Sequence, residues 1–406
     1  MRALLFLSHR LHARNFLASG QYERLIAAGI GVDVVASAEI QKEWGALPQA
    51  QCWLPLEQFV GGRARAKVRE ALRLACLVSG AQRGSRTYQH KLTLDRPWLA
   101  RQELRGWRWL SRVRDPERIA AAIERMLPIP AWLRTLPLGF YDLLILPTLM
   151  HEDNTQNDVM KAAKAKGVPV LAVPASFDTL LSKGCWLVRP DRLAVWGLDS
   201  KTDAETEHGF SPETIAIAGP PWFWPYTTMS KRQGDLVVYA GTSVAYSADE
   251  ADHVAAIQTW LQRPSDPALR YRLHPRRGTG WSLQQRDAVN TADEVSRACL
   301  LVTAFSTMII EAALCGRPSA IIAFGRSTDG RFGLKEHTEY AHMARVLSKP
   351  GVFVCRDLGM LRSAVQVFSR QPHPDPEMRS WALRVAAVSE DPRAQMVRAV
   401  RWAARR

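Results

Sequence analysis

The chain has 406 residues, with 54 Lys and Arg against 39 Asp and Glu, which gives a formal net charge of +15 and a pI near 9.9. That length is too great for one compact core and suits two domains of ordinary size. Hydrophobic residues make up 47% of the chain and charged residues 23%, which is a globular composition and excludes a disordered chain.

The excess positive charge is confined to two stretches. Residues 61–125 hold 16 Lys and Arg against 6 Asp and Glu, and residues 379–406 hold 7 against 2. An anionic partner would meet the protein at those two places. The sequence contains no zinc-finger spacing, no aromatic RNA-binding signature and no basic-zipper pattern. A nucleic-acid-binding protein is therefore kept only as an alternative, and no nucleic acid is expected as a partner.

Cysteine usage and the N-terminus both favour a cytoplasmic location. Six cysteines are scattered without a CxxC pair, and several lie in apolar runs, as small core residues do. The apolar run at residues 3–7 is too short for a signal peptide. The longest apolar run, residues 298–315, is interrupted by polar residues, so no transmembrane helix is expected.

The first part of the chain opens on a strand–helix–strand pattern. Residues 3–7 predict a strand, residues near 15–28 a helix and residues 32–36 a second strand, which is typical of a parallel sheet covered by helices. Residues 61–79 and 97–113 predict two helices, each with an arginine stripe beside apolar residues. The stripes consist of Arg65, Arg69 and Arg73 in the first helix, and of Arg101, Arg105, Arg108 and Arg112 in the second.

The alternation of strands and helices then resumes and repeats in a second series. Strands are predicted at 143–147, 170–173, 192–196, 215–217, 236–240, 270–273, 300–302 and 319–324. Helices are predicted near 155–166, 200–209, 249–262, 307–315, 357–369 and 377–404. The Pro- and Trp-rich segment 219–234 is the predicted linker between two doubly wound halves. We expect the strand carboxyl ends of both halves to face each other across a cleft that holds the site.

The strongest candidate site lies in the segment 303–318. An apolar strand runs into Ser306 and Thr307, which are predicted to cap the next helix, so free amides and two hydroxyls together form a seat for a phosphate. Glu311 lies one turn into an otherwise apolar helix, where a carboxylate needs a partner and ribose hydroxyls are good donors. The alternative is an ordinary capped helix with Glu311 at its polar edge.

A basic strand end precedes this helix. Arg272, His274 and Arg276 occupy every second position at the end of the strand predicted at 270–273. Their side chains could meet a diphosphate or stack on a base. A solvated basic loop is the alternative. A generic tight turn, of the kind that often approaches a ligand, follows the strand at 236–240. It consists of Gly241, Thr242 and Ser243.

The first half offers candidates for acid–base chemistry and for substrate binding. Asp178, just after an apolar strand, is a candidate general base and Lys183 a phosphate or substrate clamp, although Asp178 could merely cap a helix. His9 and His12 follow the first strand and could serve as bases near neutral pH, or be ordinary polar surface residues. Asp153 follows another strand and could line the cleft or belong to a polar loop.

Metal and cofactor motifs are missing from the sequence. No set of His, Cys and Asp has the spacing of metal ligands, and no Walker loop or GxGxxG fingerprint is present. No metal and no cofactor is therefore expected, and nicotinamide and ATP chemistry are disfavoured.

Several of these motifs together resemble a known family. The basic strand end at 272–276, the Ser306–Thr307 pair with Glu311, and the Gly-Arg-Pro at 316–318 look like the donor-binding half of a GT-B glycosyltransferase. They also resemble the CDP-glycerol glycerophosphotransferases and the UDP-GlcNAc 2-epimerases. The segment 176–184 is similar to a pattern of bacterial surface-polysaccharide transferases, approximately S-W-D-N-L-T-x-K-G. Asp178, Lys183 and Gly184 match this pattern, whereas Phe177, Thr179 and Leu181 depart from it.

The resemblance implies an α/β fold of GT-B type, with two Rossmann-like domains. Residues 1–220 would form an acceptor-binding domain with a basic helical insertion at 61–125. Residues 235–375 would bind a nucleotide-sugar donor, and residues 376–406 would form a basic C-terminal helix. The implied activity is transfer of a sugar to a bacterial cell-surface glycan or lipid-linked acceptor.

The resemblance also implies roles for individual residues. The Ser306–Thr307 helix start with Arg272 and Arg276 would neutralise the diphosphate without a divalent metal. Asp178 or His12 would take the proton of the acceptor hydroxyl. Glu311→Ala and Arg272→Ala are expected to abolish donor binding while leaving the fold intact. A UDP-GlcNAc 2-epimerase-like enzyme and a CDP-glycerol-type polyol-phosphate transferase are the alternatives.

The two basic stretches lie away from these motifs. The arginines of 97–113 stand beside Trp98, Trp107 and Trp109, and those of the C-terminal tail stand beside Trp402. This is a pattern that a peripheral helix uses against an anionic leaflet. We therefore expect a cytoplasmic enzyme that associates peripherally with the inner face of the cytoplasmic membrane. A solvated basic face is the alternative.

Overall fold

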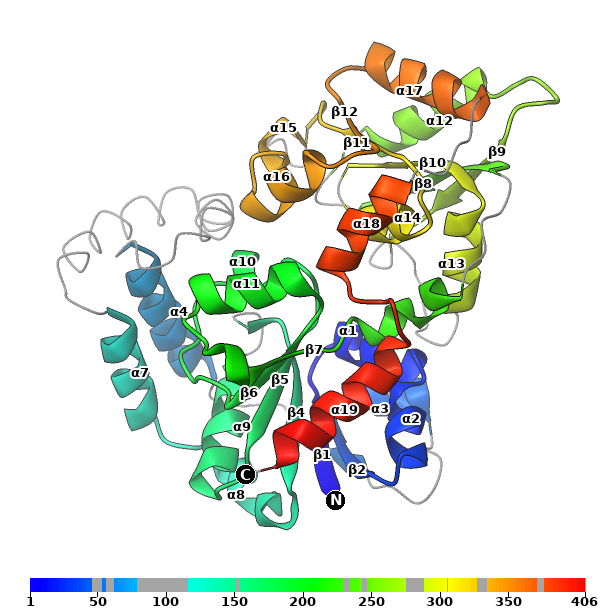
Figure 1. Ribbon diagram of the computed structural model, residues 1–406. Helices are drawn as coiled ribbons and strands as arrows, with labels where there is room; N and C mark the ends of the chain where they lie inside the picture. Colours follow the sequence, from blue (N-terminus) through cyan, green and yellow to red (C-terminus); the bar gives the residue numbers. More distant parts are fainter. Residues whose placement is uncertain are drawn as a thin grey trace. The chain divides into compact units, whose positions relative to one another are not determined.

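The computed structural model covers the whole chain, and it describes two compact units (Figure 1). Unit 1 comprises Met1–Trp222 and Glu390–Arg406, and unit 2 comprises Phe223–Ser389. The residues that the structure describes are 1–45, 53–55, 62–78, 116–150, 154–228, 234–242, 247, 249–274, 288–304, 306–326, 334–370 and 376–405.

Unit 1 is built on a seven-stranded sheet with the strand order β3-β2-β1-β4-β5-β6-β7. The strands are β1 (Arg2–Leu7), β2 (Gly31–Ala36), β3 (Trp53–Pro55), β4 (Leu143–Thr148), β5 (Val170–Pro174), β6 (Arg192–Val195) and β7 (Ile215–Ile217). All neighbouring strands in this sheet run parallel. Strands β4 and β5 are buried along their whole length, which explains why their sequences are continuously apolar rather than alternating.

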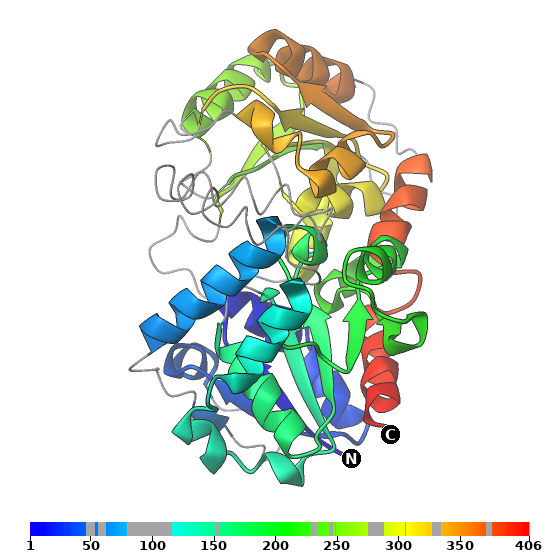
Figure 2. The same cartoon turned by 90° about the vertical axis from the view of Figure 1, so that its left-hand side faces the viewer.

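The helices of unit 1 cover this sheet. They are α1 (Arg10–Ala13), the π-helical turn η1 (Arg14–Ala18), α2 (Gln21–Ala27), α3 (Ala38–Trp44), α4 (Gly62–Val78), α7 (Pro116–Met126), α8 (Ala131–Thr135), η4 (Leu138–Phe140), α9 (Asn154–Ala165), α10 (Thr179–Ser182), α11 (Leu198–Thr206), η6 (Pro212–Thr214) and α19 (Pro392–Ala404). Helices α4 and α7 pack side by side (Figure 2). The single helix expected near 15–28 is divided, because Gly20 adopts a left-handed φ of 74° between η1 and α2.

Unit 2 holds a five-stranded parallel sheet with the order β12-β11-β10-β8-β9. Its strands are β8 (Leu236–Ala240), β9 (Ala268–Arg272), β10 (Ala298–Thr303), β11 (Ser319–Ile322) and β12 (Val352–Cys355). Its helices are α12 (Glu250–Trp260), α13 (Ala288–Ser296), α14 (Met308–Leu314), α15 (Leu334–His337), α16 (Ala341–Leu347), α17 (Leu358–Arg370) and α18 (Pro376–Val385). The two sheets confirm the predicted α/β class. Four of the cysteines are buried, as the sequence predicted for core residues. These are Cys76, Cys185, Cys299 and Cys355.

Each sheet has one place where the direction of strand addition reverses. In unit 1 this place lies between β1 and β4, and in unit 2 it lies between β8 and β10. Open α/β sheets bind their ligands outside the carboxyl ends of the strands at such switch points. The segments that follow β1, β4, β8 and β10 are therefore where each unit should hold a ligand.

The segment expected to be a linker, 219–234, contains the boundary between the two units. The first part of it is the 3-10 helix η7 (Pro221–Thr227), with Trp222, Phe223 and Tyr226 buried. Within unit 2 the rings of Phe223 and Tyr226 meet edge to face, with centroids 5.5 Å apart. In unit 1 the Arg14 guanidinium lies 5.3 Å from the ring centroid of Trp222. The aromatic residues of this segment are therefore packing groups of the two units.

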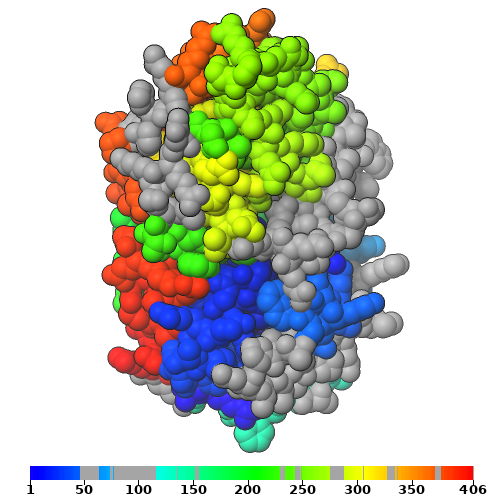
Figure 3. Space-filling view, turned by 90° about the vertical axis from the view of Figure 1, so that its right-hand side faces the viewer, coloured from blue at the N-terminus to red at the C-terminus, as the bar shows by residue number. Residues whose placement is uncertain are grey.

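The basic C-terminal helix expected over 376–406 is two helices, which corrects that prediction. Helix α18 packs on α14 in unit 2, whereas α19 packs on α2 and on strands β4–β7 of unit 1. Asp391 and Pro392 start α19, with the Asp391 carboxylate accepting a hydrogen bond of 2.9 Å from the backbone N–H of Arg393. Figure 3 shows this last segment lying against the N-terminal residues of the chain. Across the described residues, every helix falls short of the length and apolarity needed to cross a membrane.

Candidate functional site

The turn after β8 lies at the switch point of unit 2 and is held by a buried carboxylate. Glu250, the first residue of α12, accepts hydrogen bonds from the backbone N–H (2.9 Å) and the hydroxyl (3.1 Å) of Thr242. It also accepts a hydrogen bond of 2.6 Å from the hydroxyl of Tyr271. A Cβ at Gly241 would lie 2.5 Å from Glu250 Oε1 and 3.0 Å from the carbonyl oxygen of Arg272. The turn therefore requires glycine at position 241. The hydrogen bonds from Thr242 to Glu250 hold the turn in place.

Strand β10 brings the Ser306–Thr307 pair to the same switch point. Thr303 Oγ1 donates a hydrogen bond of 2.9 Å to the carbonyl oxygen of Ala240, which joins the carboxyl ends of β10 and β8. Ser306 Oγ accepts a hydrogen bond of 3.2 Å from the backbone N–H of Met308, whereas Thr307 makes no side-chain cap bond. Only Ser306 therefore caps α14, which corrects the prediction that both hydroxyls do. Both residues are partly exposed at this edge of the sheet.

Glu311 is buried in α14, and part of its carboxylate is bound within the protein. Its Oε2 accepts a hydrogen bond of 2.5 Å from the hydroxyl of Tyr226. Burial, and then the nearby Glu311 charge, raise the pKa of Tyr226 well above its usual value, so its hydroxyl stays protonated and able to donate. The sequence pattern assigned ribose hydroxyls as the donors to this carboxylate. The structure adds a donor from η7, which the pattern could not reveal.

Arg272 lies at the end of β9 and is held against α13. Its guanidinium forms an ion pair with Glu294 and donates a hydrogen bond of 3.0 Å to the hydroxyl of Thr291. Arg270 binds the same carboxylate, with Nε 3.0 Å from Oε1. Arg272→Ala would therefore remove an ion pair within unit 2 as well as a candidate donor contact, and its effect on the fold stays a prediction. His274 lies two residues beyond β9 and is partly exposed.

Three predicted site residues lie outside the part of the chain that the structure describes. These are Asp153, Ser243 and Arg276. Their assignments remain predictions, as does the arginine stripe predicted at 97–113.

The switch point of unit 1 holds a polar network that links β1 to β4. Gln156 of α9 donates hydrogen bonds to the carbonyl oxygen of Pro147 (2.8 Å) and to Ser8 Oγ (3.3 Å), and it accepts one from Thr148 Oγ1 (2.6 Å). Ser8 Oγ also lies 3.4 Å from Nδ1 of His12. This network fixes the segments after both strands where a ligand of unit 1 would bind.

The two histidines after β1 have different environments. His9 starts α1, and its Nδ1 accepts a hydrogen bond of 3.1 Å from the backbone N–H of Leu11. His12 is fully buried, and burial followed by repulsion from His9 lowers its pKa to about 3. Nε2 of His12 has no hydrogen-bond partner among the described residues. His12 is therefore neutral at physiological pH and closed off from solvent.

Asp178 and Lys183 flank the short helix α10 after β5. Asp178 is partly exposed, and its Oδ2 accepts a hydrogen bond of 2.5 Å from the hydroxyl of Ser182. Lys183 ends the helix and is buried. Of the three candidate bases, Asp178 and His9 are partly exposed and His12 is buried, and Asp178 is the carboxylate among them.

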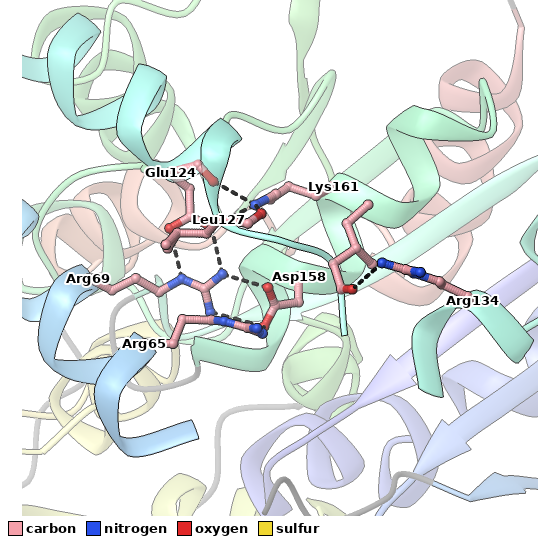
Figure 4. A network of polar contacts seen from close by, with 8 residues as sticks. Arg65, Arg69, Glu124, Leu127, Arg134, Asp158 and Lys161 are labelled. Carbon is pink, nitrogen blue, oxygen red and sulfur yellow. Dashed lines mark hydrogen bonds and ion pairs between the residues drawn. The ribbon is translucent and has the colours of Figure 1, made fainter. Parts of the chain in front are cut away.

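The arginine stripe predicted in 61–79 faces the protein interior (Figure 4). The side chain of Arg69 is 1% exposed and binds two carboxylates, with Nη2 2.6 Å from Glu124 Oε1 and 2.6 Å from Asp158 Oδ1. Arg65 Nη1 lies 3.2 Å from Asp158 Oδ2, and Arg73 is buried. This stripe joins α4 to α7 and α9 and is used inside the protein.

The contacts that sequence reasoning missed are internal ones. Glu250, Tyr226 and Gln156 each anchor a segment at a switch point, yet none of them stands in a recognisable motif. The only sequence signal for Glu250 was its position at the start of a helix after a glycine turn. Among the described residues, no group of three or more His, Cys, Asp and Glu side chains is placed to hold a metal ion.

Comparison with known proteins shows similarity at the level of fold. No protein family and no curated protein matches the sequence. Among solved structures, a putative UDP-N-acetylglucosamine 2-epimerase from Listeria monocytogenes has a TM-score of 0.51 at 12% identity, covering 97% of this chain and 94% of that one. The UDP-GlcNAc 2-epimerase from Neisseria meningitidis, bound to UDP-GlcNAc, has a TM-score of 0.50 at 9% identity and 98% coverage of both chains.

A glycosyltransferase shares the same architecture. The glycotransferase of kitacinnamycin has a TM-score of 0.50 at 11% identity, covering 97% of each chain. Two parallel Rossmann-like sheets, each with one switch point, together with these structural neighbours, show that the chain has a fold of the GT-B type.

Proposed function

We propose that the protein is a metal-independent glycosyltransferase that moves a sugar from a nucleotide-activated donor to a cell-surface glycan or lipid-linked acceptor. Unit 2 would bind the donor and unit 1 the acceptor. The reaction would take place in the cytoplasm, peripherally at the inner face of the cytoplasmic membrane.

The observation that carries this proposal is the group of residues at the switch point of unit 2. Ser306 and Thr307 are partly exposed after β10, the glycine turn at Gly241 follows β8, and the buried Glu311 lies one turn further along the chain. Hydroxyl groups and a tight backbone turn suit a diphosphate, and a fixed carboxylate suits ribose hydroxyls. His274 adds a cationic or stacking group near the same edge of the sheet.

Asp178 is the proposed base that takes the proton of the acceptor hydroxyl as the sugar is transferred. Its partial exposure and its hydrogen bond from Ser182 support this role. Full burial and a pKa of about 3 weigh against His12, which is assigned to the fixed network after β1 instead. Lys183 is the proposed clamp for the acceptor, and Asp153 is a second proposed contact.

A donor screen tests the assignment of unit 2. UDP-, GDP- and CDP-linked donors are added to the protein, and its melting temperature is measured, because a ligand that binds only the folded state raises stability by mass action. At least one nucleotide sugar should raise the melting temperature. Selective stabilisation by CDP-glycerol would instead favour a polyol-phosphate transferase, and no response to any nucleotide would contradict the proposal.

Glu311→Gln tests the same site with less disturbance than an alanine. Glutamine retains an oxygen that can accept the hydrogen bond from Tyr226, so the fold should persist while the affinity for the stabilising nucleotide falls. Glu339→Gln, at an exposed carboxylate of unit 2, is the matched control and should bind like the parent protein. Equal affinity in all three proteins would remove Glu311 from the donor site.

The second candidate function is UDP-GlcNAc 2-epimerisation. It is favoured by the epimerases among the structural neighbours. Incubation with UDP-GlcNAc and no acceptor, followed by NMR of the sugar, separates the two activities. An epimerised sugar without acceptor would overturn the transferase proposal, whereas unchanged UDP-GlcNAc would count against the epimerase.

A further inference from the structure

Helix α7 turns a carboxylate inward and its large apolar side chains outward. Glu124 is fully buried, where Arg69 binds it, whereas Ile119 is 46%, Ile123 37% and Met126 81% exposed. Residues three and four positions apart lie on one face of a helix, so these three residues form a single apolar stripe. A helix of a soluble domain normally turns such a stripe toward the core. In α7 that side is occupied by the ion network of Glu124.

The exposed charges of α4 and α7, among the described residues, have one sign. Among the side chains of α4 and α7 that the structure describes, the exposed charged ones are all cations, namely Lys67, Arg118 and Arg125. The acidic residue Glu124 is buried, and Glu70 and Glu117 are partly buried. We call the set Arg118, Ile119, Ile123, Arg125 and Met126 the α7 face.

We propose that the α7 face docks onto an anionic lipid bilayer. An apolar stripe bordered by Lys and Arg is the pattern of helices that lie in a membrane interface, where the apolar side chains enter the acyl boundary and the cations meet anionic headgroups. A nucleic acid would satisfy the cations but leave Ile119, Ile123 and Met126 in water. The arginine stripe of α4 is unsuitable for this purpose, because Arg69 and Arg73 are buried.

The inference deepens the proposed function, because a lipid-linked acceptor is found at such a surface. The inference rests on the proposed function only for the reason why the protein would bind a membrane. Binding to lipid follows from the α7 face alone and needs neither a nucleotide nor an acceptor.

Cosedimentation with vesicles tests the proposal. The full-length protein is mixed with vesicles of phosphatidylglycerol and phosphatidylcholine, or of phosphatidylcholine alone, at low and high salt. We expect binding to the anionic vesicles at low salt and weaker binding at high salt, since the cations contribute by a screened attraction. In the double variant Ile119→Gln/Ile123→Gln, we expect the partition coefficient to fall by about tenfold or more, because the apolar contribution is lost.

A matched double variant controls for the loss of exposed apolar area. Met360→Gln/Val367→Gln alters two residues of α17 that are 43% and 55% exposed, and it should bind vesicles like the parent protein. All four altered positions are exposed, so both variants should melt at the parent temperature.

Three results would overturn the proposal. The first is equal binding to neutral and anionic vesicles, and the second is unchanged binding of the Ile119→Gln/Ile123→Gln variant. The third is absence of vesicle binding together with self-association that this variant abolishes in sedimentation velocity, which would make the α7 face an interface between copies of the chain. Vesicle binding without any response to nucleotides would sink the proposed function and leave the docking surface standing.

Discussion

At the scale of single residues, His12 shows how burial changes the chemistry that a sequence suggests. A histidine after the first strand is a candidate base near neutral pH, yet its ring is fully buried and its pKa falls to about 3. The unfolded chain binds a proton at this position near pH 6.5, and the folded protein does so only near pH 3. The stability that the neutral His12 contributes is therefore complete above pH 6.5 and is lost as the pH falls toward 3.

The first prediction follows from that linkage. The free energy of unfolding should fall below pH 6.5 with a His12 component of up to about 1.4 kcal/mol per pH unit, and His12→Gln should lack that component. Urea unfolding of both proteins between pH 7 and pH 5 measures the difference. Parallel pH profiles for the two proteins would show that His12 takes up its proton in the folded state.

Gly241 gives a second prediction at this scale. A Cβ at this position would lie 2.5 Å from Glu250 Oε1, so Gly241→Ala should destabilise unit 2 by about 1–3 kcal/mol and weaken nucleotide binding. Gly139→Ala is the control, since nothing lies within 4 Å of the Cβ that it would add. Melting temperatures with and without the stabilising nucleotide measure both effects. A Gly241→Ala protein as stable as the parent would mean that the glycine turn is not tightly packed.

At the scale of elements, the contact among α4, α7 and α9 depends on a buried ion network. Arg69 binds Glu124 and Asp158, and Lys161 Nζ donates a hydrogen bond of 2.5 Å to the carbonyl oxygen of Glu124. Burying these charges is costly unless each finds its partners. The sequence predicted α4 and its arginine stripe, but periodicity alone could not tell whether the stripe faces solvent or carboxylates on other helices.

Removal of the central cation should be far more harmful than removal of an exposed one. Arg69→Met leaves two carboxylates buried without their main partner, so unit 1 should lose about 3–5 kcal/mol of stability. Arg398→Met breaks an ion pair with Glu390 that is 62% and 64% exposed, and it should cost less than about 1 kcal/mol. Denaturant unfolding compares the two variants. Equal losses would contradict the central role of Arg69.

At the scale of the whole molecule, unit 1 is built from two separate stretches of the chain, whereas unit 2 is one continuous stretch. The last helix, α19, returns to unit 1, where Met396 and Val400 are buried and Arg192 donates a hydrogen bond of 2.9 Å to the carbonyl oxygen of Trp402. This arrangement corrects the expectation of a separate basic helix at 376–406. Within α19, Arg401 and Trp402 are used for packing on unit 1.

A chain ending at Ser389 tests the role of α19. Its loss uncovers apolar surface on unit 1, so unit 1 should melt at a lower temperature or aggregate, while unit 2 retains its response to the stabilising nucleotide. Arg401→Ala is the control, because it keeps the helix and removes the hydrogen bond of 2.6 Å to the carbonyl oxygen of Ala28. An unchanged melting profile for the shortened chain would make α19 dispensable.

The sequence by itself determined the alternation of strands and helices, the α/β class and the position of the Ser306–Thr307 and Gly241 motifs after strands. These features are local, since apolar runs, glycines and hydroxyl pairs act over a few residues. Only the tertiary structure decided which polar groups are already used inside the protein. Arg69, Arg272, His12 and Glu311 all looked available along the sequence, yet ion pairs, hydrogen bonds or burial engage each of them. The partners lie far away along the chain, and they meet only when the helices pack on the two sheets.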